Sequence, residues 1–462
     1  MPNVYGLLTI GRNALMAQQK AIDITGNNIA NVNTAGYSRQ RLNLVQNSPV
    51  RMNGITMSTG VKAEQRIQRF YDQFVNAQLN TENESLGRWE ARKNALENVE
   101  VLFDETSGYG LSAAMADYWE AWQDLSNNPS GYAERVGVVN AGAYLSSAFT
   151  GLRSGLVNLQ QDIDNRVDGV VAEANQIASQ IADLNVKIIE VEVTGHNAND
   201  YRDQRDALTN QLSKLIDIES FEDEAGALTV MVGGGRSLVE KGNAWTLSTA
   251  DNGGVQDVFW QDSSGGLTNI TDRIDSGELK GWIESRDSII NEYISQLDQL
   301  AAGIISEVNS LHGAGYGLDG SQNLFFTGSD ASDMAVNGAL VGNANLVAAA
   351  TDVAALPGDN SAAIAIASLQ SGLTMAGGTS TFDSYYNSLI SKVGSDVQAA
   401  DISYGHQSSM IGLLEQRRQE VSGVSLDEEM INLIKFQHAY SAAAKLITTT
   451  DEMLQTLLSM KP

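Results

Sequence analysis

Residues 14–40 read ALMAQQKAIDITGNNIANVNTAGYSRQ, and their apolar positions predict a long terminal helix. A heptad of apolar residues begins just before this stretch and a second apolar seam runs beside it: Leu8, Leu15, Ile22 and Ile29 in the first, and Leu7, Ile10, Ala14, Ala17, Ala21 and Ile24 in the second. Two adjacent seams of largely small residues form a broad apolar face, which suits close contact with more than one helix. The pattern stops in the polar string 27–36, where asparagine and glycine end helices.

The other end of the chain carries a similar pattern. Residues 423–458 read GVSLDEEMINLIKFQHAYSAAAKLITTTDEMLQTLL, with seam residues three or four apart: Leu433, Phe436, Tyr440, Ala443, Ile447, Thr450, Leu454 and Leu457. We expect this helix to begin after Ser425, with Glu428 completing a capping box. Both ends are therefore predicted to be amphipathic helices, which pair with each other within one subunit or with neighbouring subunits.

Three internal segments show the same alternating spacing of three and four residues, at 167–191, 290–311 and 390–414. A less regular helical pattern covers residues 67–104. Helices of this length bury a narrow seam against each other, because propensity alone stabilises an isolated helix too little. The sequence predicts a bundle of long helices, and these seams alone would equally suit a generic helical bundle.

The periodicity changes between the first and second internal segments. Short alternating runs separated by turn residues extend from residue 216 to about 270. They predict a small inserted β domain, whereas residues 313–378 are expected to hold loops, short strands and a short helix near 362–369. The predicted fold class is mainly α with inserted β: an elongated rod of long helices, terminal helices forming a coiled-coil layer, and a small outward β domain.

We expect three parts in this chain. The terminal helices, residues 1–50 with 424–462, form an inner axial layer. Residues 51–215 with 276–423 form a helical rod domain that includes the mixed loop region near 313–380. Residues 216–275 form a small outer β domain.

The charge of the 462-residue chain is strongly negative, with a formal net charge of −27. This charge repels phosphate backbones and anionic lipids, so neither nucleic-acid binding nor membrane-surface binding is expected. Residues 1–62 nevertheless hold six basic residues against one acidic residue, and residues 217–278 hold twelve acidic against three basic. Either acidic residues collect on any solvated surface, or the acidic middle faces solvent while the ends face protein.

The chain has no cysteine, which excludes disulfides and thiolate chemistry. No run of eighteen apolar residues occurs, and the first thirty residues lack a basic region followed by an uninterrupted apolar one. We therefore expect neither a Sec-type signal nor a membrane-spanning segment. If this protein leaves the cell, an export route other than the Sec pathway must recognise it.

Few residues are candidates for catalysis, metal binding or phosphate binding. His196, His312, His406 and His438 are scattered and form no metal-binding motif. Residues 315–320, GYGLDG, match GxGxxG, but they follow a helical seam and open no helix, so the phosphate-binding geometry is missing. Asp223 and Glu224 lie in a predicted acidic surface turn, which explains them more simply than a calcium site does. We predict no catalytic residue, no metal ligand and no cofactor.

Both ends resemble a known family. Residues 14–40 resemble the N-terminal motif of flagellar rod, hook and hook-associated proteins, and residues 423–458 are similar to the matching C-terminal motif. Residues 36–40, GYSRQ, look like the hook-associated form of that motif. The interior runs YRDQRDAL at 201–208 and NLFFTG at 323–328 are also similar to hook-associated members.

The resemblance implies a non-enzymatic structural subunit that joins the flagellar hook to the filament. Its implied partners are the hook protein, a second junction protein (hook-associated protein 3), copies of itself in a ring and a cytoplasmic export chaperone. It implies type III export from the cytoplasm and an extracellular location at the hook-filament junction.

The resemblance also implies two sets of site residues. The axial assembly interface would consist of Leu8, Leu15, Ile22, Ile29, Asn27, Asn28, Asn31, Gly36 and Tyr37. An interface for assembly and for the chaperone would consist of Leu433, Phe436, Tyr440, Ile447, Leu454 and Leu457. The alternatives are another axial protein of the flagellum, a hook or rod subunit, or a hydrolase carried on an axial scaffold. The long seams and residues 36–40 favour the junction.

Overall fold

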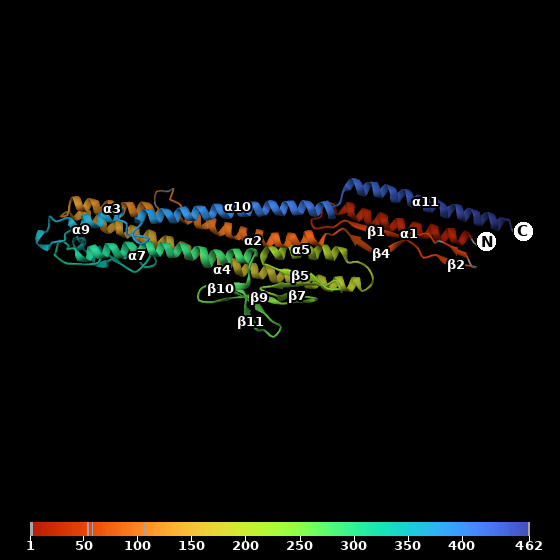
Figure 1. Cartoon of the computed structure of the whole chain (residues 1–462), viewed down its shortest axis with the longest axis horizontal. Coiled ribbons are helices and arrows are strands. Elements are labelled where there is room, and N and C mark those ends of the chain that lie inside the picture. Colours follow the sequence, from red (N-terminus) through yellow and green to blue (C-terminus); the bar gives the residue numbers. More distant parts are fainter. Residues whose placement is uncertain (1–2, 53–54, 58, 106–107, 109, 461–462) are drawn as a thin grey trace.

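The computed structural model describes residues 3–52, 55–57, 59–105, 108 and 110–460. The molecule is elongated: long helices run along its length, small antiparallel sheets project from its side, and both chain ends lie at one extremity (Figure 1). The predicted fold class, mainly α with inserted β, is confirmed.

Helices α1 (Asn3–Ala30) and α11 (Leu426–Ser459) lie side by side in opposite directions, and we call them the terminal pair (Figure 1). Small side chains let the two helices approach closely. At Gly11, an added Cβ would lie only 2.8 Å from Cγ1 of Ile447. In α1, the buried apolar residues Ala17, Ala21 and Ile24 are four and three residues apart. In α11, the buried residues Ala443 and Thr450 are seven residues apart. Pairing within one subunit is thus the arrangement that the structure shows.

Four strands follow α1, and the sequence analysis did not predict them. Strands β1 (Gln40–Gln46) and β4 (Val61–Arg69) pair antiparallel with a register shift between Leu42 and Leu44, and β2 (Val50–Met52) pairs with β3 (Ile55–Met57). The β1–β4 ladder lies along α1. Its apolar alternation is interrupted where the register shifts, because the consecutive apolar residues Leu44 and Val45 are both exposed, so the period-two signal is weak.

The rest of the molecule is the rod. Its helices are α2 (Gln73–Leu102), α3 (Leu111–Asn127), α4 (Tyr132–Glu192), α5 (Asn199–Leu215), α6 (Gly277–Glu284), α7 (Asn291–Ala314) and α10 (Phe382–Ser422). The predicted internal seams are buried, most regularly in α10, where buried residues recur every seven positions: Tyr386, Val393, Ala400, Gln407 and Leu414.

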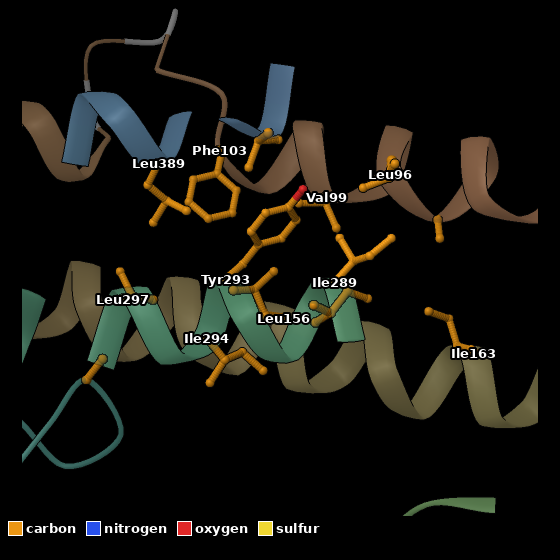
Figure 2. Packing of buried hydrophobic residues seen from close by; sticks show 14 of the residues in the cluster. Leu96, Val99, Phe103, Leu156, Ile163, Ile289, Tyr293, Ile294, Leu297 and Leu389 are labelled. Atoms are coloured by element: carbon orange, nitrogen blue, oxygen red, sulfur yellow. The ribbon is translucent and has the colours of Figure 1, made fainter. Parts of the chain in front are cut away.

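One apolar core runs through the rod. Figure 2 shows Phe103, at the end of α2, packed beside Val99 of the same helix, Tyr293 of α7 and Leu389 of α10. The Phe103 and Tyr293 rings meet edge-on with centroids 6.3 Å apart. Large aromatic side chains bury most apolar area per residue, so they dominate the stability of this part of the molecule.

A π-helical turn, Ser285–Ile290, joins α6 to α7 without a break. The extra residue in a π turn shifts the phase of the helix, so Arg286 points into the core, where it is fully buried and pairs with Asp164 and Asp287. The sequence pattern began only at residue 290 because this shift interrupts the three-four period.

The inserted β structure lies between Leu215 and α6, as predicted. Strands β5 (Glu219–Glu222), β6 (Leu228–Val232), β7 (Arg236–Glu240) and β8 (Asn243–Ala244) form one sheet, and β9 (Thr246–Asp251), β10 (Gln256–Gln261) and β11 (Leu267–Asn269) form another. A 3₁₀ turn, Thr271–Arg273, leads back to α6. Asn175 of α4 holds the second sheet through two 2.8 Å bonds with the backbone of Leu247.

The end of the rod opposite the chain termini holds the predicted mixture of loops and short elements. These are β12 (Phe326–Thr327), β13 (Ala335–Val336), α8 (Gly338–Gly342), α9 (Ser361–Ala367) and 3₁₀ turns at Ala344–Leu346, Val353–Ala355 and Ser368–Ser371. The short helix expected near 362–369 is α9 and the turn after it.

Candidate assembly site

The polar string after α1 forms a compact turn that leads the chain from α1 into β1. Backbone bonds from Thr34 N–H to Asn31 O (2.9 Å) and from Tyr37 N–H to Thr34 O (3.2 Å) close it. Gly36 has φ +80°, a conformation that side-chain-bearing residues avoid. This turn brings residues 37–40 back against the end of α1.

Asn28, in the last turn of α1, bonds the residues that follow this turn. Its side chain is 1% exposed, and its Oδ1 accepts from Gln40 N–H (3.0 Å) and from the Tyr37 hydroxyl (2.8 Å). Its Nδ2 donates to Gln40 O (2.9 Å) and to Oε2 of Glu429 in α11 (3.0 Å). All four hydrogen-bonding positions of this amide are therefore used within the chain.

Glu429 receives a second partner from the same turn. The Arg39 Nε donates to Glu429 Oε1 at 2.8 Å, and the Arg39 Nη1 donates to Glu428 Oε2 at 2.8 Å. The Arg39 backbone N–H also donates to Ser422 O, at the end of α10. Helix α11 begins after Ser425 as predicted, but the expected capping box is wrong: Ser425 makes no side-chain cap bond, and the Glu428 carboxylate bonds Arg39.

The other side of the turn is fixed to α5. Asp203 is 7% exposed and accepts from Ser38 N–H (2.9 Å) and from Arg69 Nη1 (2.8 Å), which also donates to Asp206 Oδ2 (2.7 Å). Burial raises the pKa of Asp206, although Arg69 opposes that shift. Burial likewise raises the pKa of Tyr37, helped by Asp200, Asp203 and Glu429 nearby. The phenol therefore stays protonated and able to donate.

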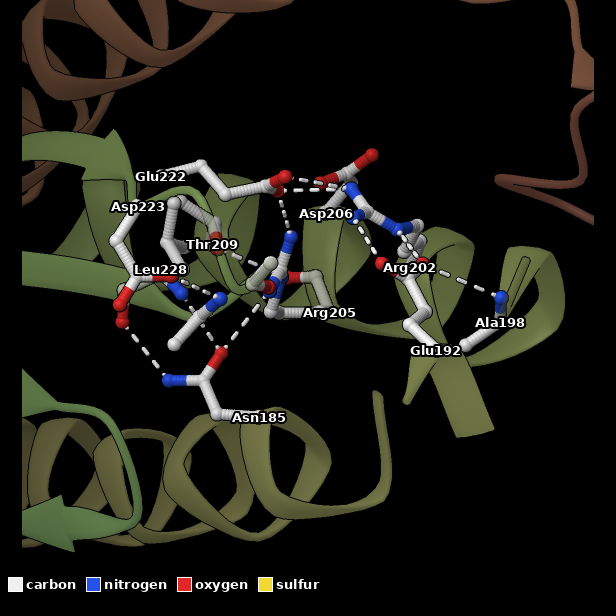
Figure 3. Close-up of polar contacts among 12 residues, drawn as sticks. Asn185, Glu192, Ala198, Arg202, Arg205, Asp206, Thr209, Glu222, Asp223 and Leu228 are labelled. Carbon is white, nitrogen blue, oxygen red and sulfur yellow. Dashed lines mark hydrogen bonds and ion pairs between the residues drawn. The ribbon is translucent and has the colours of Figure 1, made fainter. Parts of the chain in front are cut away.

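The run 201–208 connects this region to the β structure. Figure 3 shows Arg202 between Glu192 and Glu222, and Arg205 between Glu222 and Asn185. Arg205 is 1% exposed and also donates to Gly226 O at 2.7 Å. These residues belong to an intramolecular charge network, and the sequence pattern by itself did not reveal their partners.

The predicted interface residues of α1 differ in accessibility. Leu8, Leu15, Ile22 and Ile29 are partly exposed, as are Asn31, Gly36 and Tyr37, and Asn27 is exposed. Asn28 alone of this set is fully buried. The heptad seam is thus left incompletely covered, whereas the second seam is buried at Ala17, Ala21 and Ile24.

The predicted interface of α11 lies largely against α1. Leu433, Phe436, Tyr440, Ile447 and Leu454 are partly buried, and Leu457 is 39% exposed. A different apolar set in α11 is exposed, and the sequence analysis missed it because its members lie on the side of the helix away from the seam: Met430, Ile431, Ile434 and Met453. The signal that could have revealed this set is the presence of apolar residues on the side of the helix opposite its complete seam.

Two residues considered for metal binding, His312 and Asp223, have structural roles. His312 is buried, and its ring nitrogens meet Asn323 O (2.6 Å) and Ala348 N–H (2.9 Å). Burial lowers its pKa to about 4, so it is neutral: Nδ1–H donates to Asn323 and Nε2 accepts from Ala348. Asp223 Oδ1 accepts from the N–H groups of Ala225 and Ala227, which closes a surface turn.

The GxGxxG match at 315–320 also has a structural explanation. Gly315 ends α7, and the loop leads to the short strand β12 rather than to a helix, as expected. Within the described part of the chain, no group of three or more His, Asp and Glu side chains is arranged to hold a metal ion. No described helix is both long enough and apolar enough to cross a membrane.

This chain is similar to known proteins along most of its length. Family models match three parts of the chain: "Flagella basal body rod protein" at residues 8–37, "Flagellar hook-associated protein FlgK helical domain" at 96–326, and "Flagellar basal body rod FlgEFG protein C-terminal" at 415–460. The first and last cover much of the terminal pair. A paired set of terminal helices with these matches defines a flagellar axial protein.

Relatives narrow that class. Flagellar hook-associated protein 1 of Bacillus subtilis (strain 168) is 30% identical, with 99% of each chain covered, and that of Escherichia coli (strain K12) is 25% identical, with 98% of this chain and 100% of the relative covered. The chain belongs to the flagellar hook-associated protein 1 family, and it is a structural component of the bacterial flagellum.

A solved structure shares the fold. The flagellar hook junction protein FlgK from Burkholderia pseudomallei aligns with a TM-score of 0.68 at 14% identity, over 75% of this chain and 100% of that one. The relatives are structural flagellar proteins, which agrees with the absence of catalytic motifs from the sequence. The resemblance found at the two chain ends is confirmed.

Proposed function

We propose that this protein joins the flagellar hook to the filament by packing its terminal pair against neighbouring subunits. The observation that carries this proposal is the apolar surface left on the pair after α1 and α11 have covered each other. Ile431 is 66% exposed and Met453 is 49% exposed, on the side of α11 that faces away from its seam with α1. Exposed apolar patches of this kind are covered by partner proteins.

Two sides of the terminal pair are available. The α1 heptad, Leu8, Leu15, Ile22 and Ile29, is partly exposed, and the exposed apolar residues of α11 add a second surface. Two surfaces suit a ring or stack in which each pair meets more than one neighbour. The neighbours we propose are copies of this chain, the hook protein and hook-associated protein 3.

The same surface supports the proposed route of assembly. Before export the exposed apolar residues of α11 would be open to aggregation, so a cytoplasmic chaperone covering α11 is part of the proposal. Its site would take in Leu457 and the partly buried Phe436 and Tyr440. Export through the flagellar type III apparatus would then place the protein outside the cell at the hook-filament junction.

Deletion of the gene tests the proposal. We expect cells that keep a hook, lack a filament and release flagellin into the medium. Retained filaments would contradict the proposal, and loss of the hook itself would instead indicate a hook or rod subunit.

A double substitution tests the surface. Ile431→Ser with Met453→Ser should abolish filament formation while the rod melts at the wild-type temperature, because both side chains are exposed in the subunit and lie on the same side of α11. The matched control is Val353→Ser, an exposed residue near the opposite end of the rod (49% exposed), which should leave filaments intact. Normal filaments in the double variant would exclude this face as the interface.

A further inference from the structure

Side chains of α4 hold the inserted β structure by bonding the backbone of its strands. In the second sheet, which consists of β9, β10 and β11, the N–H and the C=O of Leu247 both bond Asn175, at 2.8 Å each. In the first sheet, the N–H and the C=O of Leu228 bond Asn185 at 2.9 Å and 2.8 Å. A residue in an antiparallel ladder exchanges the same two bonds with its partner strand, so each amide takes the place of a strand.

A third contact of this kind lies beside the tip of the β9–β10 hairpin, and two helices contribute to it. Asp164 of α4 accepts from Gln256 N–H through Oδ1 (3.1 Å), and Arg286 Nη1 donates to Gln256 O (2.8 Å). Gln256 is the first residue of β10, whereas β11 pairs with residues 259–261. The rod therefore bonds the part of the β10 edge that lies beyond β11.

Arg286 is buried and bonded through all three of its guanidinium nitrogens. Its side chain is 0% exposed, and Nη1 also donates to Asp164. Its Nε and Nη2 donate to the two carboxylate oxygens of Asp287, at 2.6 Å and 3.0 Å. A guanidinium presents its donors in a rigid planar fork, so these partners determine its orientation as well as its position.

The π turn Ser285–Ile290 places Arg286 in this contact. Each residue of a regular helix turns the side-chain direction by about 100°, so the extra residue of a π turn changes how position 286 points relative to α7. The backbone of the turn is held as well, since Gln160 Nε2 donates to Arg286 O at 3.0 Å. With this phase, the guanidinium reaches both α4 and β10.

Two anchors fix the direction of the hairpin, whereas one would leave a rotation open. Asn175 and Asp164 are eleven residues apart in α4, which is about 16 Å at roughly 1.5 Å per residue. Their partners lie toward opposite ends of the hairpin, because Leu247 is near the start of β9 and Gln256 directly follows the tip. Buried hydrogen bonds depend steeply on distance and angle, so this pair of anchors specifies one arrangement.

We propose that Arg286, together with Asp164, is a positioning residue that holds the second sheet at one angle to the rod, and that the π turn serves to place it. Buried ion pairs contribute little net stability compared with apolar packing, and in some proteins they specify geometry instead. The inference concerns the rod and its β structure, so it does not depend on the proposed function.

Distance measurement between spin labels on the full chain tests this inference. The chain has no cysteine, so a label at Ser147→Cys in α4 can be combined with one at Leu267→Cys in β11, both exposed positions. A second pair, Ser147→Cys with Phe221→Cys in β5, reports on the first sheet, which Asn185 holds without Arg286. We expect a narrow distance distribution for both pairs in the chain without further substitution.

The decisive variant is Arg286→Met, which keeps an unbranched side chain but removes every donor. The 147–267 distribution should become at least about twofold wider, because Gln256 O loses its donor and the tip of the hairpin then moves about the anchor at Leu247. The 147–221 distribution should not change. Arg286→Lys should give an intermediate width, because a single ammonium cannot reproduce the fork. This variant also carries the test if Arg286→Met, which leaves Asp164 unpaired, fails to fold.

Arg153→Met is the matched control. Arg153 Nε donates to Asp298 at 2.9 Å and joins the same two helices, α4 and α7, without touching the sheet. Both distributions should stay narrow in this variant. Three results would overturn the inference: an unchanged 147–267 width in every Arg286 variant that folds, equal widening of both distributions, or widening of the 147–267 distribution in Arg153→Met. These measurements use the isolated subunit, so they are independent of the deletion phenotype that tests the proposed function.

Discussion

The rod and the terminal pair are both built of long helices with apolar seams, but they bury different side chains. In the rod, Tyr118, Trp119 and Trp122 are at most 1% exposed. In the terminal pair, the most deeply buried apolar residues are small, Ala17 and Ala21, and among the large ones only Ile24 is buried in the described residues. Buried aromatic area stabilises the rod as a unit, whereas close contact of small residues leaves the pair with surface for neighbours.

The largest effect that tests this difference between the rod and the terminal pair is expected in the rod core, on the free energy of unfolding. Trp119 stacks on Phe382 with ring centroids 5.9 Å apart. Trp119→Ala should lower the free energy of unfolding by about 3–5 kcal/mol, because it removes a large buried side chain and leaves a cavity. Urea denaturation followed by circular dichroism measures this loss. Phe74→Ala is the control: this side chain is 67% exposed, and a loss as large there would refute the distinction.

The second prediction concerns His312 and acid. Because burial lowers its pKa to about 4 in the folded chain, the unfolded chain binds the proton first as the pH falls. The contribution of His312 to stability is thus complete above about pH 6.5 and is lost as the pH falls towards 4, by at most about 3 kcal/mol.

Nuclear magnetic resonance titration of the His312 ring measures this pKa, with His312→Asn used to assign its signals. A midpoint near 6.5 in the folded protein would contradict a neutral, buried histidine at the far end of the rod.

The third prediction separates the terminal pair from the rod. Gly11→Val places a side chain against Ile447, so it should destabilise the pairing of α1 with α11 by about 1–3 kcal/mol. Hydrogen exchange should accelerate in both helices while the rod amides remain protected. Gly26→Ala is the matched control, since an added Cβ there meets no atom within 4 Å. Equal acceleration in the two variants, or loss of rod protection, would show that the two regions are not separable.

The smallest expected effect is at the base of the β structure. Glu84 accepts from Ile218 N–H at 3.1 Å, and burial raises its pKa to about 7 even though that bond opposes the shift. The folded chain therefore holds this proton more tightly than the unfolded one, and stability falls as the pH rises from about 4.5 to 7.

Glu84→Gln should remove this loss. Glutamine still accepts from Ile218, and we expect a gain of roughly 1 kcal/mol at pH 8, after allowance for partial exposure, with no gain at pH 4. Thermal melts at the two pH values measure it. Glu100→Gln, an exposed position on the same helix, serves as the control, and a pH-independent change in Glu84→Gln would exclude the proposed titration.

Much of the architecture could be predicted from the sequence. The seams of α4, α7, α10 and α11 are visible because helical periodicity is local, and the inserted β structure is visible because its period differs. The strands β1 and β4 were missed because their alternation is incomplete. The start of the α6–α7 helix was missed because the π turn at Ser285–Ile290 shifts the phase.

The residues predicted for the assembly interface stay a prediction. The α1 heptad, Leu8, Leu15, Ile22 and Ile29, is partly exposed, whereas the α11 seam mostly faces α1. Glu428 was assigned to a capping box because its spacing from Ser425 fits one, whereas the structure gives it a partner distant in sequence, Arg39. Sequence spacing predicts local partners, and distant competitors do not appear in it.

The amino-acid pattern alone predicts that both ends of this chain are amphipathic helices with small-residue faces, and the motifs at 14–40 and 423–458 indicate the flagellar axial family. Which seam is covered, and what surrounds the terminal pair, follows only from the folded chain. Asn28 and Glu429 are 401 residues apart and meet at 3.0 Å. Periodicity reports which face of a helix is apolar, because it depends on neighbouring residues; what covers that face depends on how the whole chain packs.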